Sequence, residues 1–594
     1  MTAGVRQEPR EAHRPRTPWR ARLPVLLALL AGLAGVGYRL ALLFADAPPS
    51  NSDEATMGLA ALHIARGEDL PVWFYGQAYM GTLEAYLAAP LVALTGPAVL
   101  TLRLPTLALY ALFLALSWRL TRRLGGGDWF ALLVVGFLAL GSDRVIKNQL
   151  IAGGGYPELN PAGVGLALLT VGLCADRTRA RLPRWAAWGL VSGLMLWVDP
   201  LVLPYVLGTG AVLVARRRRE LAGRAGPVVA GAVLLGAAPM LLDSLRHGRN
   251  PLTAVLAAGG GEASASWGER LHGGLVLGPP LGMGFCSPSH CAGWQLWWAV
   301  AFPLLLLLAV FTAGRSLRRP APPTDPGLLS LAANGRSPRS GDDPGGAAGR
   351  RVSAAVRLAL LGGAAAVLAA YTVSDAAGRT PIESARYLSC LAIATPALLW
   401  PLWRAARRAD LRSARQLGGP AMAATVAHRH LADPASTSAG PTAGRPAAGD
   451  RRARAVGLAG VAVLGAILGT AAVASGAAIG RVPALHAEAD RHRALVDTLT
   501  ELGVRHVRGG YWTCNRLTFA TGEDVICAVV DDELRPGFDR LPAYRRAVAA
   551  DPGAAWVAPA GSPLAARLDG RLGPGRGALE VVTVQGWRIY LPRR

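Results

Sequence analysis

The residues best suited to chemistry are two adjacent carboxylates, Asp53 and Glu54. They follow the first long apolar segment of the chain, at the point where a membrane helix would reach water. Charged groups beside a membrane core cost free energy unless they serve a water-accessible cavity. A carboxylate in such a cavity can take a proton from a hydroxyl group, so both residues are candidate catalytic groups.

The loop that follows mixes aromatic, amide and acidic side chains, a mixture that suits a sugar better than lipid. It supplies four candidate substrate-binding residues, namely Tyr75, Gln77, Tyr79 and Glu84. Two alternatives stay open. The aromatic residues are equally typical of a membrane interface, and Glu84 is equally suited to a structural ion pair with Arg103.

Further charged residues stand at the expected ends of apolar segments. Asp143 is a third candidate catalytic carboxylate and Glu158 a further binding residue, although Asp143 would also suit the cap of a helix. Three basic residues, Arg103, Lys147 and Arg386, could hold a phosphate group and stabilise its charge as it leaves. For Arg386 the alternative is an anchor that reaches the lipid headgroups.

The composition indicates a membrane scaffold for these residues. Of the 594 residues 52% are hydrophobic and 17% charged, and the formal net charge is +24. Several apolar runs reach roughly 17–25 residues, enough to cross a bilayer as a helix. Arginines cluster in alternate segments between these runs, which is the positive-inside pattern of a membrane protein and argues against nucleic-acid binding. The clusters lie near 14–22, 122–123, 177–184, 216–219, 315–319 and 404–408.

The sequence therefore predicts a mainly α, polytopic transmembrane bundle of about eleven spans with a cytoplasmic N-terminus. A signal peptide that ends near Ala47 is the alternative for the first span. The two short segments around Asp199 and Pro200 indicate a hairpin, and a single span is the alternative. The expected spans lie near 23–45, 98–118, 128–142, 160–175, 185–199, 201–215, 226–243, 293–313, 353–373, 387–403 and 456–480.

The chain divides into membrane modules, linkers and one outer domain. We expect a helix near 485–502 in the outer domain, strands near 504–508, 524–530 and 554–558, and a final strand pair near 578–591, which together form an α/β layer. The expected divisions are a basic cytosolic N-terminus at 1–22, a transmembrane module with outer loops at 23–313, a disordered cytosolic linker at 314–352, transmembrane helices at 353–403, a second disordered linker at 404–455, a last transmembrane helix at 456–480 and an extracytoplasmic α/β domain at 481–594.

Four cysteines fit this topology. Cys286 and Cys291 share an expected outer loop, and Cys514 and Cys527 share the outer domain. Each pair is a candidate disulfide in an oxidising compartment.

Several of these segments resemble the GT-C glycosyltransferases, polytopic membrane enzymes that use polyprenyl-phosphate sugars and include protein O-mannosyltransferases and aminoarabinose transferases. The resemblance is most specific at the acidic pair and covers the membrane region best up to about residue 210. The segments that carry it are Asn51–Ala55, Gly76–Tyr86, Leu102–Pro105, Arg386–Leu388 and Tyr511–Phe519. The family's loop often continues with a His-Pro-Pro type signature, whereas this chain has Tyr75-Gly-Gln-Ala-Tyr79.

The resemblance implies a GT-C-like catalytic module and an inverting sugar transfer on the outer face of the plasma membrane. Asp53 matches the family's first-loop aspartate and would be the catalytic base, and Asp143 falls near a second acid of the family. Arg103, Lys147 and Arg386 are candidates for binding the donor phosphate. The expected partners are a polyprenyl-phosphate sugar, a protein, lipid or wall-glycan acceptor, and membrane lipids. No cofactor or metal is expected, although some relatives use a divalent ion. The alternatives are a lipid or polysaccharide transporter or flippase, and a non-catalytic envelope assembly protein.

Overall fold

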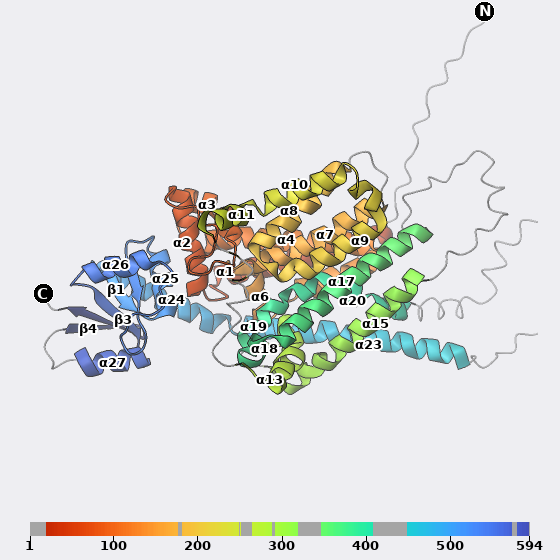
Figure 1. Cartoon of the computed structure of the whole chain (residues 1–594). Helices are drawn as coiled ribbons and strands as arrows, with labels where there is room; N and C mark the ends of the chain where they lie inside the picture. Colours follow the sequence, from red (N-terminus) through yellow and green to blue (C-terminus); the bar gives the residue numbers. More distant parts are fainter. Residues whose placement is uncertain are drawn as a thin grey trace, which may run out of the picture.

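The computed structural model describes residues 19–175, 181–248, 250, 253, 264–287, 291–318, 346–407, 448–572 and 579–592. A long helical bundle forms most of the molecule, and a small domain with a β-sheet lies at one end of it (Figure 1). The predicted fold class, mainly α with a C-terminal α/β domain, is confirmed. The segments expected as the cytosolic N-terminus and the two linkers lie mostly outside the described residues.

The N-terminal half of the bundle is a series of helices with two short helices, α2 and α3, near the C-terminal domain (Figure 1). The elements are α1 (Trp19–Phe44), α2 (Ser52–Arg66), α3 (Leu83–Thr95), α4 (Val99–Arg123), α5 (Asp128–Ala139), α6 (Asp143–Leu150), α7 (Tyr156–Ala175), α8 (Leu182–Val198), the 3-10 turn η1 (Pro200–Val202), α9 (Leu203–Leu221), α10 (Ala225–Gly236) and α11 (Ala238–His247).

The second half of the bundle ends in a long helix that leads into the C-terminal domain (Figure 1). The elements are α13 (Trp267–Leu271), the π-helical turn η2 (His272–Leu277), α14 (Gly278–Gly282), η3 (Gly293–Leu296), α15 (Trp297–Arg318), α17 (Ala347–Val373), α18 (Asp375–Arg379), α19 (Pro381–Ser384), η4 (Ala385–Ala394), α20 (Thr395–Leu398), α23 (Ala448–Gly480) and α24 (Val482–Glu501).

The number of membrane spans differs from the prediction. Among the described residues seven helices are long and apolar enough to cross a bilayer, or nine if two bent helix pairs each count as one span. The bends measure 91° between α5 and α6 and 63° between α10 and α11. The expected hairpin forms as α8 and α9, but α8 has only 17 residues and α9 includes Arg216–Arg219, so a count of eleven is not confirmed.

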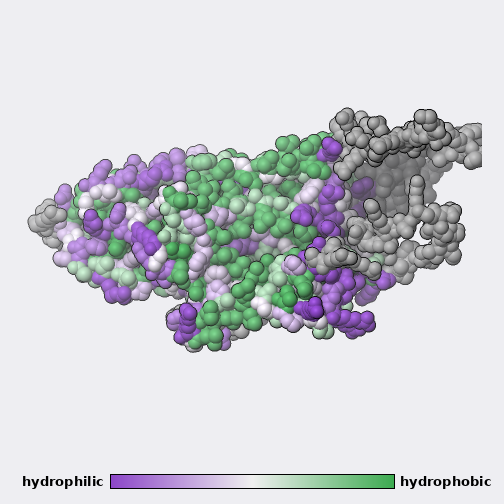
Figure 2. Space-filling view, turned by 90° about the horizontal axis from the view of Figure 1, so that it is seen from above, coloured by the Kyte–Doolittle hydropathy of each residue, from purple (hydrophilic) through white to green (hydrophobic). Residues whose placement is uncertain are grey.

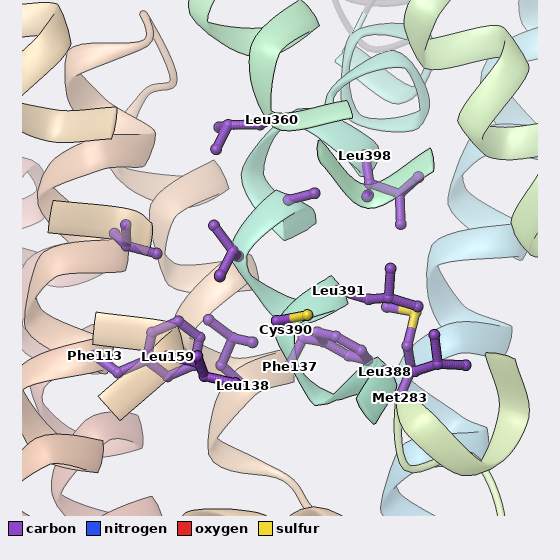
Figure 3. Packing of buried hydrophobic residues seen from close by; sticks show 14 of the residues in the cluster. Phe113, Phe137, Leu138, Leu159, Met283, Leu360, Leu388, Cys390, Leu391 and Leu398 are labelled. Carbon is purple, nitrogen blue, oxygen red and sulfur yellow. The ribbon is translucent and has the colours of Figure 1, made fainter. Parts of the chain in front are cut away.

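The bundle is held by one extended apolar core. Figure 3 shows part of it, where Phe113 of α4, Leu159 of α7 and Leu388 of η4 are all buried. Hydrophobic residues also gather over the middle of the face seen in Figure 2, whereas hydrophilic residues gather toward the end that carries the C-terminal domain. A helical bundle that is apolar on both its inside and its outside is typical of a protein in a bilayer. Together with the apolar helices, this surface indicates that the chain is a multi-pass membrane protein.

The C-terminal domain is a mixed five-stranded sheet flanked by helices, in the strand order β2-β1-β3-β5-β4. Strand β1 pairs in parallel with β2 and β3, and β5 pairs antiparallel with β3 and β4. The elements are β1 (His506–Gly509), α25 (Tyr511–Ala520), β2 (Ile526–Val529), α26 (Pro542–Ala550), β3 (Ala555–Pro559), α27 (Pro563–Leu572), β4 (Leu579–Val584) and β5 (Trp587–Pro592).

Helix α25 of this domain packs closely on α2 of the bundle. A Cβ atom at Gly58 of α2 would lie 2.5–2.8 Å from three ring atoms of Phe519, which is closer than van der Waals contact allows. Phe519 is buried, so its ring has little room to move away. The absence of a side chain at Gly58 is therefore what lets the domain lie against the bundle.

Gly58→Ala is expected to weaken this packing by about 1–3 kcal/mol, because an added methyl group overpacks the contact. Hydrogen–deuterium exchange of α2 and α25 in the purified protein should become faster. Gly37→Ala is the matched control, because the space around Gly37 of α1 is open. Equal exchange of α25 in the two variants would contradict the close packing.

Candidate active site

Helix α2 carries both carboxylates of the acidic pair in its first turn. Its first turn is stabilised by Asn51, whose Oδ1 accepts a hydrogen bond from the Glu54 N–H at 2.9 Å. It ends at Gly67, which adopts the left-handed conformation with φ of 71°. Neighbouring residues on a helix differ by about 100° around its axis, so Asp53 and Glu54 face different surroundings.

Glu54 faces the interior and forms a bidentate ion pair with Arg103 of α4. The Nε and Nη2 atoms of Arg103 each donate to a carboxylate oxygen of Glu54 at 2.6 Å, and Nη1 donates to the Pro48 carbonyl at 2.8 Å. Both side chains are almost fully buried. The structure therefore does not favour the expected role of Arg103 in holding a donor phosphate, because its guanidinium is buried and paired with Glu54. The alternative pairing of Arg103 with Glu84 is also not formed.

Asp53 faces the C-terminal domain, which supplies two donors to one of its oxygens. The Tyr511 hydroxyl donates to Asp53 Oδ1 at 2.6 Å, and Arg540 Nη2 donates to the same oxygen at 2.8 Å. Arg540 Nε also donates to the Tyr511 oxygen at 2.6 Å, which closes a triangle of hydrogen bonds. The Asp53 side chain is 26% exposed, against 6% for Arg540, so the carboxylate stays accessible while its partner is buried.

The electrostatics of this triangle keep Tyr511 as a hydrogen-bond donor to Asp53. Burial and the Asp53 carboxylate raise the pKa of Tyr511 above its ordinary value, so the phenol keeps its proton and acts as a donor. A guanidinium beside a carboxylate stabilises the charged form of both groups. The triangle therefore fixes the orientation of the Asp53 carboxylate.

A second set of contacts joins the C-terminal domain to the far end of α2. Glu523, in the turn after α25, lies 3.0 Å from His63 Nε2 and 2.5 Å from Arg66 Nη1. The Tyr544 hydroxyl donates to Glu523 at 2.6 Å. Burial opposes the charge on Glu523, but hydrogen bonds from His63 and Tyr544 and the Arg66 charge outweigh it and lower the pKa of Glu523 to about 2. The domain is thus held along the whole length of α2.

A glycine loop closes the other side of the site. Gly154 and Gly155, both with positive φ, donate their N–H groups to Glu84 at 3.0 and 3.2 Å. Glu158, at the start of α7, is buried and lies close enough to Glu84 for their charges to interact. Two carboxyls in one buried site resist double ionisation. The structure thus brings the two glutamates together in one buried site, where Glu84 fixes the loop that places Gly153 beside Asp53.

Tyr75, Gln77 and Tyr79 lie in the turn between α2 and α3, and they differ in their contacts. The Tyr75 hydroxyl donates to Asp69 at 2.9 Å and contacts His63, so its role is to hold the turn. The Gln77 N–H donates to the Phe74 carbonyl within the turn at 2.8 Å. Tyr79 is near enough to Asp53 for an electrostatic interaction.

Arg386 is the one of the three predicted phosphate-binding residues whose charge interacts with that of Asp53. Its guanidinium lies 5.7 Å from the ring centre of Tyr156 and 5.5 Å from that of Tyr387. Stacking of this kind fixes the plane of an arginine while its edge stays available for hydrogen bonds. The charges of Arg386 and Asp53 interact, and Tyr79 interacts with both.

Asp143 and Lys147 lie together on α6. Asp143 Oδ2 accepts hydrogen bonds from Arg481 at 2.6 Å and from Ser287 at 2.7 Å. Asp143 thereby ties α6 to the junction of α23 and α24. Lys147 is partly buried, and its charge interacts with that of Asp143. Within the described ranges no hydrogen bond or ion pair joins Asp143 to Asp53.

The described residues also include two disulfides and one group of side chains of the types that bind metal ions. Disulfides join Cys286 to Cys291 and Cys514 to Cys527. Among the residues that the structure describes, one group could offer three ligands to a cation: His63, Glu68 and Glu523. All three already have protein partners, since His63 contacts Tyr75, Glu68 pairs with Arg66 and Glu523 accepts from Tyr544, so the group is satisfied as an ion-pair network.

Arg540 is the residue of the site that sequence reasoning missed. It lies in a loop before α26, in a segment with no membrane periodicity, 487 positions after its partner Asp53. Tyr511, by contrast, opens one of the segments that resemble GT-C enzymes. Arg540 lies next to Tyr511 in space. No motif or spacing in the sequence indicates that contact.

Solved structures with the same arrangement decide the fold. ArnT from Cupriavidus metallidurans, in a crystal structure bound to undecaprenyl phosphate, matches with a TM-score of 0.52 and 16% sequence identity over 97% of this chain and 98% of that one. The chain has a GT-C fold. The apo crystal structure of ArnT matches the chain with a TM-score of 0.51 and 15% identity, covering 96% and 97% of the two chains.

A more distant GT-C structure is the archaeal oligosaccharyltransferase AglB from Archaeoglobus fulgidus in complex with an inhibitory peptide and a dolichol-phosphate. Its TM-score is 0.44 at 11% identity, over 97% of this chain and 75% of that one. No protein-family model matches the sequence, and neither does any curated protein.

Glu54→Gln is expected to destabilise the GT-C bundle by about 3–5 kcal/mol, because it leaves the buried Arg103 charge without its partner. The midpoint of thermal unfolding, followed by tryptophan fluorescence in detergent, should fall clearly. Glu68→Gln removes a carboxylate from an exposed ion pair and should change the midpoint little. Similar midpoints for the two variants would contradict a structural role for the Glu54–Arg103 pair.

Glu523 is expected to stabilise the docked domain only above the pH range in which it titrates. Its pKa falls from an ordinary value of 4.5 to about 2, so its contribution is complete above pH 4.5 and is lost as the pH falls toward 2. At neutral pH, Glu523→Gln should lower stability by about 1–3 kcal/mol. The difference between wild type and variant should shrink on acidification; a difference that is constant with pH would contradict the assignment.

Proposed function

We propose that the protein is a membrane glycosyltransferase that transfers a sugar from a polyprenyl-phosphate donor to an extracytoplasmic acceptor, with inversion at the anomeric carbon. The observation that carries the proposal is the accessible Asp53 carboxylate, whose charge interacts with that of Arg386 in a GT-C fold. Asp53 is the proposed general base. Arg386, with Lys147 as a second cation, is the proposed site for the donor phosphate.

The donor class is supported by the fold likeness and by the chemistry of these groups. ArnT, which shares the fold, was crystallised with undecaprenyl phosphate. A stacked guanidinium can hold two phosphate oxygens through parallel hydrogen bonds, and it offsets the charge that grows as the phosphate leaves. Because cationic side chains meet this charge, the proposed reaction includes no metal ion or other cofactor.

The proposed reaction is a single displacement. The acceptor hydroxyl oxygen attacks the anomeric carbon while the bond from that carbon to the lipid phosphate breaks, and the electron pair of the broken bond stays on the phosphate. The hydroxyl proton passes to Asp53. A free carboxylic acid is far stronger than a sugar or serine hydroxyl, so the proton moves as the new bond forms and not before it.

The proposed location is the plasma membrane, with the N-terminus in the cytoplasm and the C-terminal domain outside. Clusters of arginine at alternate ends of the helices support this orientation. The two disulfides also fit an oxidising exterior, since Cys514–Cys527 lies within the C-terminal domain and Cys286–Cys291 lies in a loop of the bundle. The acceptor would be a hydroxyl group of a protein, a lipid or a wall glycan on that side.

Asp53→Asn is expected to lower transfer by about 10²–10⁴-fold, because the amide cannot take the proton. The full-length protein would be reconstituted in vesicles with a membrane lipid extract that contains polyprenyl-phosphate sugars and with an envelope fraction as acceptor. Release of free polyprenyl phosphate would be measured by mass spectrometry. Folding should persist, since the amide oxygen can still accept hydrogen bonds from Tyr511 and Arg540.

Asp490→Asn is the matched control, because Asp490 is an exposed carboxylate of α24. Its rate should equal that of the wild type. An Asp53→Asn variant that transfers at the wild-type rate would reject the assignment of the base. Movement of lipid-linked sugar across the vesicle membrane without any use of acceptor would instead identify a flippase.

A further inference from the structure

The proposed base is held by the C-terminal domain and not by the helical bundle that carries it. Both donors that reach Asp53, the Tyr511 hydroxyl and Arg540 Nη2, belong to that domain and bind the same oxygen, Oδ1. Within the described part of the chain, no hydrogen bond occupies the second oxygen, Oδ2. One oxygen is thus fixed and the other is left available.

The two donors are themselves rigid. Arg540 Nη1 donates to the Tyr75 carbonyl at 3.1 Å, and the guanidinium lies 4.5 Å from the ring centre of Phe74. The backbone carbonyl of Tyr511 accepts a hydrogen bond from the Ser52 hydroxyl, next to Asp53 itself. These contacts tie both donors to the bundle on either side of the carboxylate, so Asp53 has one favoured orientation.

We propose that Tyr511 and Arg540 are positioning residues that fix Asp53 through Oδ1 and direct Oδ2 to the acceptor hydroxyl. The inference rests on the proposed function, because it assigns a role in the same proton transfer. As the acceptor oxygen bonds to the anomeric carbon, its proton moves to Oδ2, and the sugar–phosphate bond breaks with its electron pair on the phosphate. The C-terminal domain is then part of the catalytic site, although it touches no reacting atom.

The competing interpretation is that this contact only docks the domain. Glu523 makes it possible to separate the two, because it ties the same domain to the same helix through His63 and Arg66, at the opposite end from Asp53. A docking role would make loss of Glu523 and loss of Arg540 equivalent. A positioning role would make only the loss of Arg540 or Tyr511 affect the chemical step.

The test compares Glu523→Gln with four further variants of the full-length protein in the vesicle assay described above. Arg540→Gln should lower the maximal rate of polyprenyl phosphate release by about 10–100-fold, as expected for a misplaced catalytic group. The lipid extract concentration at half-maximal rate should stay unchanged. Tyr511→Phe should cause a smaller loss, and Arg540→Lys should recover part of the activity. Arg535→Gln, which removes an exposed arginine of the same domain, should behave as wild type.

The pH dependence gives a readout that a docking role would not change. The charged and titratable groups that face Asp53 are Tyr511 and Arg540 of the domain and Tyr79 and Arg386 of the bundle. Without the cation at position 540 a carboxylate binds a proton more readily. The acidic limb of the rate profile should therefore move to higher pH in Arg540→Gln and stay in place in Glu523→Gln.

Equal losses of maximal rate in Arg540→Gln and Glu523→Gln, with no change in the acidic limb, would overturn the inference. If Arg540→Gln fails to fold, the losses of maximal rate in Tyr511→Phe and Arg540→Lys, compared with that of Glu523→Gln, decide the question. An active Asp53→Asn variant would reject the proposed function itself. An inactive Asp53→Asn variant beside fully active Tyr511→Phe and Arg540→Gln variants would reject the positioning role alone.

Discussion

The buried ion pair between Glu54 and Arg103 determines how the rest of the site is arranged. In a low-dielectric interior a paired carboxylate and guanidinium resist separation, because either group alone would be an uncompensated charge. The pair fixes the rotation of α2 about its axis and its position against α4. Since the neighbouring residue points about 100° away, fixing Glu54 inward turns Asp53 outward, toward the C-terminal domain. The two carboxylates of one motif thus divide into an anchor and a candidate base.

Several contacts fix the part of the C-terminal domain that carries Tyr511. Tyr511 begins α25, and the Cys514–Cys527 disulfide joins α25 to strand β2 in the centre of the domain core. The close approach of Phe519 to Gly58 and the contacts of Glu523 hold the same helix against α2 at two further points. The position of the Tyr511 hydroxyl is therefore set by the fold of the sheet domain as well as by its own hydrogen bonds.

Much of this architecture could be predicted from local sequence. The strands of the outer domain and the hairpin at Asp199 follow from alternating apolar patterns and turn residues, and Asp53 follows from its place beside an apolar segment. The number of spans could not be predicted, because hydropathy measures how apolar a segment is and not whether it bends, as α5–α6 and α10–α11 do. The sequence also could not predict which glutamate pairs with Arg103, because Glu54 and Glu84 have the same charge and only packing decides between them.

The distance along the chain between Asp53 and its partners has a consequence for biogenesis. Tyr511 and Arg540 follow Asp53 by 458 and 487 positions, so they leave the ribosome long after the first helices have entered the membrane. Throughout that interval α2 carries a carboxylate whose Oδ1 lacks both donors. The site is complete only when the C-terminal domain has folded onto α2. A chain that stops short of this domain would enter the membrane without either donor to Asp53, so folding of the C-terminal domain completes the site.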